Sequence, residues 1–76
     1  MKTYAMLSEQ WSEAVRLRDH HAAMADLSYS NGDTTAHLLH ILHRENYALK
    51  ARMLYMRMAQ MAEANGQELE QLIAQQ

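Results

Sequence analysis

The chain has 76 residues and a formal net charge of −2 with its histidines neutral. This length allows one domain at most, over residues 1–76, and lies near the lower limit at which a single hydrophobic core suffices. The acidic balance argues against nucleic acid as the main partner, because binding to a phosphate backbone depends on many basic contacts. The lack of cysteine excludes a disulfide framework, a thiol nucleophile and a cysteine-based zinc site.

The composition predicts an all-α protein. Proline is absent, Gly32 and Gly66 are the two glycines, and the chain is rich in residues that favour helices, such as alanine, leucine, methionine and glutamate. The sequence has no run of about 18 apolar residues, and its N-terminal stretch becomes polar too soon for a signal peptide. We therefore expect neither secretion nor a membrane span, and place the chain in the cytoplasm.

A first helix is predicted over about residues 8–29, with Ser8 as its N-cap; Thr3 offers a start one turn earlier. Its apolar residues recur every three or four positions, which is typical of a face turned toward a core. They are Tyr4, Leu7, Trp11, Ala14, Val15, Ala22, Ala25 and Tyr29. The small alanines in this set allow a neighbouring helix to approach closely.

A turn is predicted over residues 30–33, because asparagine and glycine tolerate positive φ and Asp33 or Thr34 can cap a following helix. So short a connection forces the two flanking helices to run antiparallel. We therefore expect a helical hairpin in which Tyr29 lies near the start of the second helix. Trp11 should lie near residues 50–54 of that helix.

The second helix, predicted over about residues 34–64, is apolar on two faces. Helical spacing of about 100° per residue gives a first stripe and, roughly opposite, a second one. The first consists of Leu38, Leu39, Leu42, Leu49, Met53 and Met56; the second consists of His37, His40, Tyr47, Ala51, Tyr55, Met58 and Ala62, with Arg44 in its middle. One neighbouring helix can cover only one face. We expect the first stripe to form the core of the hairpin.

The second stripe then needs another cover, and the simplest is a second copy of the chain. Two hairpins would form a dimeric helical bundle, or a higher even-numbered oligomer. The residues predicted to line the oligomer or partner interface are Tyr47, Ala51, Tyr55, Met58, Met61, Trp11 and Arg44. After the stop signal Asn65–Gly66, the spacing of Leu69, Leu72 and Ile73 predicts a short third helix over about residues 67–75.

The five histidines are the first place to look for a metal. His37 and His40 lie three residues apart and project from one side of a helix, where neutral imidazoles could ligate zinc or copper. A third ligand is missing from the same face, so histidines at an interface or on the surface are the simpler interpretation. No cofactor is expected.

The sequence best fits a non-enzymatic protein that acts by protein–protein binding, as an adaptor, regulator or inhibitor. It would bind itself and another protein, but no membrane. One alternative is a bundle that binds a metal or a small anion through His37, His40 and Arg44. The second alternative, a regulator that binds nucleic acid, would use Arg44 and the basic residues Lys50, Arg52 and Arg57, which do not share one face. No nucleophile, base and acid occur at a spacing that indicates catalysis.

Overall fold

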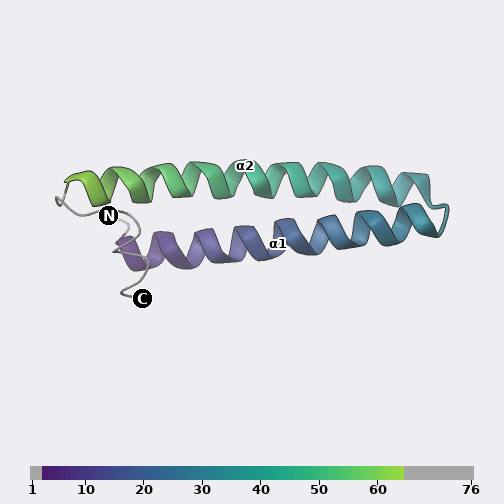
Figure 1. Cartoon of the computed structure of the whole chain (residues 1–76), viewed down its shortest axis with the longest axis horizontal. Coiled ribbons are helices and arrows are strands. Elements are labelled where there is room, and N and C mark those ends of the chain that lie inside the picture. The colour runs from purple at the N-terminus through teal and green to yellow at the C-terminus, as the bar shows by residue number, and fades with distance from the viewer. Residues whose placement is uncertain (1–2, 65–76) are drawn as a thin grey trace.

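A computed structural model shows two long helices that pack side by side and antiparallel (Figure 1). The structure describes residues 3–64, in which α1 spans Tyr4–Ser30 and α2 spans Thr34–Ala64. Within this range every regular element is a helix, which confirms the predicted all-α hairpin. The short third helix predicted over residues 67–75 lies outside the described residues.

α1 begins at Tyr4, one turn before the start predicted at Ser8. Thr3 is the N-cap: its backbone is extended, and its side-chain Oγ1 accepts a hydrogen bond from the backbone N–H of Met6 at 3.2 Å. This bond satisfies one of the N–H groups that a helix start leaves without a partner. The earlier of the two possible starts is therefore the correct one, and Ser8 lies inside the helix.

The turn between the helices follows the predicted chemistry. Gly32 has a φ of 76°, a left-handed conformation that residues with a side chain rarely adopt. Around it, the N–H of Gly32 donates to the carbonyl of Tyr29 at 3.1 Å, and that of Asp33 donates to the carbonyl of Ser28 at 2.9 Å. These are the two bonds of a Schellman ending. Asp33 also caps α2, because its Oδ1 accepts the N–H of Ala36 at 3.0 Å.

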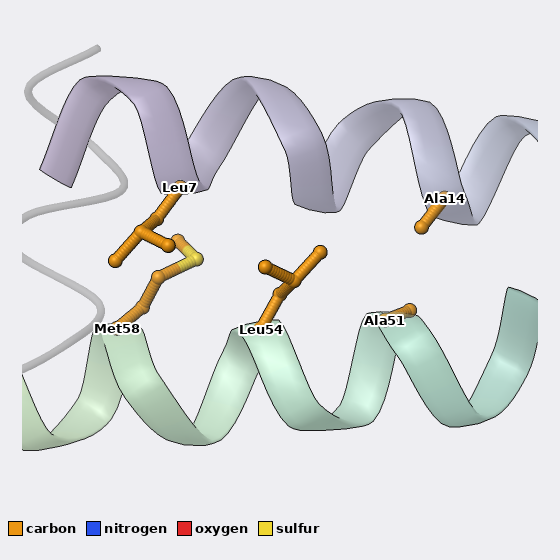
Figure 2. Close-up of a cluster of buried hydrophobic side chains, with 5 residues drawn as sticks. All are labelled: Leu7, Ala14, Ala51, Leu54 and Met58. Atoms are coloured by element: carbon orange, nitrogen blue, oxygen red, sulfur yellow. The ribbon is translucent and has the colours of Figure 1, made fainter. Parts of the chain in front are cut away.

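The core lies between the two helices and is built from few large side chains. Its buried members are Leu7, Ala14, Ala51, Leu54 and Met58, and Tyr4, Trp11, Val15 and Met61 pack against them. Figure 2 shows Leu7 and Met58 pointing toward one another, with Ala14 facing Ala51. The opposed alanines let the helix backbones approach. The leucine and methionine side chains fill the space on the side of this pair away from the turn.

Candidate interaction surface

The two apolar faces of α2 are used in the opposite way to our prediction. The buried residues of α2 are Ala51, Leu54, Met58 and Ala62, and three of these belong to the second stripe. Met58 has no exposed surface at all. The prediction that the first stripe forms the core of the hairpin is therefore wrong, because α1 covers the second stripe, which was predicted to meet a partner.

The physical reason for this reversal lies in contacts that only the second stripe can make with α1. Its histidines and tyrosines carry both apolar rings and polar atoms. His37 Nδ1 donates to the backbone carbonyl of Ala25 at 2.7 Å, and the ring of Tyr55 lies 6.3 Å from that of Trp11, centroid to centroid. Ala51 of the same face lies opposite Ala14 of α1. The leucine and methionine side chains of the first stripe offer no polar partner for α1.

The first stripe faces away from α1 and is exposed along its whole length. We call it the leucine–methionine stripe; its members are Leu38, Leu39, Leu42, Leu49, Met53 and Met56. Leu49 is 58% exposed and Met56 is 55% exposed, although both are large and apolar. Scattered exposed leucines are common on protein surfaces, but an apolar face that runs along one helix, here interrupted by Asn46, marks a contact surface.

Charged and polar residues border this stripe on both sides. Glu45 and Arg52 lie on one flank, and Lys50 and Arg57 lie on the other; all four are exposed. The ion pairs found in residues 3–64 join Glu13 to Arg16 and Arg18 to Asp19, and both lie within α1. A shallow groove follows the second flank, lined by Asn46, Leu49, Lys50, Met53 and Arg57 of α2 and by Gln10 of α1. A second helix laid on the stripe would meet charges on both of its sides.

The interface residues predicted from the sequence lie mostly against α1. Ala51 and Met58 are buried there, and Met61 packs on the core cluster. Trp11 contacts Tyr55 and lines a hollow with Ala48, Ala51 and Arg52, which confirms its predicted position near residues 50–54. The remaining members, Tyr47 and Arg44, are half-buried.

The histidines gather near the turn end of the hairpin. His21 of α1 is at the centre: its Nδ1 lies 2.8 Å from Nδ1 of His40, and its ring stacks on His43 at 4.9 Å and on Tyr47 at 5.6 Å, centroid to centroid. His20 meets the edge of the same ring. A bond between two imidazole nitrogens requires one donor and one acceptor, so the His21–His40 pair cannot be doubly protonated and keep it.

This crowding lowers the pKa of His21 below its usual value. Desolvation on burial is the largest cause, followed by repulsion from the positive charges that His43, His20 and His40 carry when protonated. The neutral form of the His21 imidazole is therefore favoured. No carboxylate is among the groups that shift this pKa.

The predicted metal ligands His37 and His40 contact different residues of α1. His37 Nδ1 donates to the carbonyl of Ala25, and its ring lies 5.2 Å from that of Tyr29, whereas His40 faces His21. The contact between Tyr29 and His37 also confirms the predicted position of Tyr29 near the start of α2. Across residues 3–64, no group of three or more histidines and carboxylates is placed to hold a metal ion.

Comparisons with known proteins give no match: no family model fits the chain, and neither a curated protein nor a solved structure is similar to it. Within residues 3–64, neither helix combines the length and the hydrophobicity that crossing a membrane requires.

Proposed function

We propose that this chain is a small non-enzymatic protein that acts by protein–protein binding, as an adaptor, regulator or inhibitor, and that it works as a homodimer or higher even-numbered oligomer. The leucine–methionine stripe of α2 is its contact surface, and a second copy of the chain is the occupant. The observation that carries the proposal is the exposure of this apolar face while α1 covers the opposite one.

A second copy is the best fit because the stripe has the same chemistry along its length and a symmetric partner covers both stripes at once. Burying a whole leucine or methionine side chain contributes about 1.5–3 kcal/mol, so covering an exposed half contributes about 1 kcal/mol. In a symmetric dimer each stripe residue occurs in both copies, so a substitution removes its contribution twice. Removing one stripe residue should therefore weaken the dimer by about 2 kcal/mol, roughly a 30-fold increase in Kd.

The outward face of α1 remains uncovered in such a dimer. It carries Glu9, Glu13, Arg16, Asp19 and His20, a mixture of both charge signs. We propose that a target protein would meet this face, because polar and charged groups around a binding surface select partners by complementary charge. Each dimer would present it twice.

The proposal is tested by the mass of the particle in solution, measured by light scattering after size exclusion over a range of concentrations. The unaltered chain should show twice the monomer mass, and Leu49→Glu should shift it to the monomer with its helical circular dichroism retained. Leu27→Glu is the matched control, since Leu27 is a leucine of α1 with 53% exposure that lies away from the stripe. A monomer at all concentrations up to about 100 μM, where a dimer with a Kd of about 1 μM would be largely formed, would refute the proposal.

A further inference from the structure

The outward face of α2 has the spacing of a coiled-coil contact. Leu42, Leu49 and Met56 follow one another at intervals of seven residues. A second set, Leu39, Asn46 and Met53, has the same interval and precedes the first set by three positions. The second set occupies the a positions of a heptad repeat and the first set occupies the d positions. Both positions face a partner helix when two helices wind around each other. All of these residues are exposed in the hairpin.

The charges beside the stripe differ between its flanks. The flank that precedes the a positions carries Glu45 and Arg52, one of each sign. The opposite flank carries His43, Lys50 and Arg57, and so is basic or neutral. In coiled coils these flanking positions form the ion pairs that set the orientation of the two helices.

We infer that the leucine–methionine stripe binds α2 of a second copy in the antiparallel orientation, with Glu45 of each copy beside Arg52 of the other. The inference rests on the proposed self-association and adds the orientation and register of the two chains. It follows from comparing the flanks in the two possible orientations.

In a parallel pair, opposite flanks of the two helices meet. Glu45 would then lie near Lys50 of the second copy, but Arg52 would lie near Arg57 of the second copy, and this repulsion occurs twice. In an antiparallel pair, the same flank of both helices meets, because a two-fold axis across the helices turns one of them end over end. Glu45 then meets Arg52 twice on one flank. On the other flank the basic residues of the two copies meet, but in the register described next Lys50 lies nearest His43 of the second copy rather than a second lysine or arginine. Charge complementarity therefore favours the antiparallel orientation.

The extent of the stripe fixes the register. When Leu39 lies opposite Met56 of the second copy, Leu42 lies opposite Met53, and Asn46 opposite Leu49. Leucine then meets methionine in the two outer layers, and Asn46 meets leucine in the central one. A shift by one heptad would place leucines or methionines against Gln60 and Glu63, or against the turn, so it covers less of the stripe.

Asn46 is the polar residue inside this face. In the register above, the Asn46 residues of the two copies lie about three positions apart along the axis, or about 4.5 Å at ~1.5 Å per residue. They can then hydrogen-bond each other across the contact. A single polar residue at an a position commonly fixes register and orientation at some cost in affinity.

Disulfide trapping distinguishes the two orientations, and the absence of native cysteine makes each introduced thiol unique. The variants Leu39→Cys and Met56→Cys are equilibrated separately and as a mixture in a glutathione buffer. Leu27→Cys, on the outward face of α1, controls for random collision. Before oxidation, light scattering on the reduced variants is used to check that each still pairs.

Antiparallel pairing predicts a cross-linked dimer in the mixture, containing one chain of each variant, and little cross-linking of either variant alone. Cross-linking of Leu39→Cys to itself and of Met56→Cys to itself would show a parallel dimer and overturn the inference, while the proposed self-association would stand. If the unaltered chain is a monomer and no variant cross-links above the control, both fall.

Charge reversal gives an independent readout. In the antiparallel dimer, Glu45→Arg and Arg52→Glu should each weaken pairing by about tenfold, and the double variant should restore it. In a parallel dimer, Arg52→Glu alone would strengthen pairing, because it would replace two repulsive contacts with Arg57 by attractive ones. Tighter binding by this variant would therefore overturn the inference.

Discussion

Two methionines of α2 offer a direct test of which face is the core. Met58 is fully buried and points toward Leu7 across the hairpin (Figure 2). Met56, two residues away on the helix, is 55% exposed. Replacing a fully buried methionine by alanine removes its transfer free energy and leaves a cavity, at a cost of about 2–5 kcal/mol. We expect Met58→Ala to lower the free energy of unfolding by about 3 kcal/mol. This is a large part of the roughly 4–11 kcal/mol typical of a chain of this length.

Met56→Ala makes the same chemical change without opening a cavity inside the hairpin. We expect it to cost the isolated hairpin less than about 0.5 kcal/mol, the usual size of a surface substitution. Its effect should instead be on pairing, where it removes one contact from each copy. Because binding to the folded state adds stability by mass action, that effect grows with protein concentration.

The assay is urea unfolding followed by far-ultraviolet circular dichroism at two protein concentrations, one below and one above the dimer dissociation constant. Met58→Ala should lower the midpoint at both concentrations. Met56→Ala should lower it only at the higher one. If Met56→Ala at the lower concentration costs as much as Met58→Ala, then both faces of α2 contribute equally to the hairpin and the assignment of the core to one face is incorrect.

Three further substitutions test the ends of the hairpin. The pKa of His21 is lowered, so the folded chain binds this proton less readily than the unfolded chain. Its contribution to stability should be full above about pH 6.5 and fall as the pH drops below that value. His21→Gln should flatten this fall in Tm, and an equally steep fall in the variant would contradict the role of His21. Gly32→Ala should cost about 1 kcal/mol in urea unfolding because of the positive φ, although nothing lies near the added methyl group; an unchanged midpoint would contradict the turn geometry. Tyr4→Phe should leave the Tm unchanged or raise it, since its buried hydroxyl has no hydrogen-bond partner in residues 3–64, and a clear loss would reveal a bond to that oxygen.

The turn and the helix ends could be predicted because their chemistry is local. A glycine at positive φ and an aspartate that caps the next helix act within a few residues, so their positions in the sequence are enough. The short turn also sets the register between the helices, which is why the neighbours of Trp11 and Tyr29 could be predicted. The predicted start of α1 lies one turn too far along the chain, because Ser8 and Thr3 are both good caps and the sequence does not rank them.

The face of α2 that meets α1 could not be predicted from hydrophobicity, which ranks leucine and methionine above histidine, tyrosine and alanine. The choice depends on pairs between the helices, such as Ala14 facing Ala51 and the bond from His37 to the carbonyl of Ala25. The same limit applies to the histidines. Spacing along α2 groups His37 with His40, whereas the fold pairs His40 with His21 of α1. A search for matching small residues on both helices would have favoured the correct face.

The two faces of α2 therefore have different physical roles. The contact with α1 combines close packing of small side chains with polar bonds from histidine, and such bonds fix one register because an unpaired buried polar group is costly. The outward face carries side chains that gain free energy from burial but specify little, apart from Asn46 and the flanking charges. A thin core limits what the hairpin alone can reach in stability. Covering the outward face adds to it by mass action, so the Tm of the hairpin should rise with its own concentration.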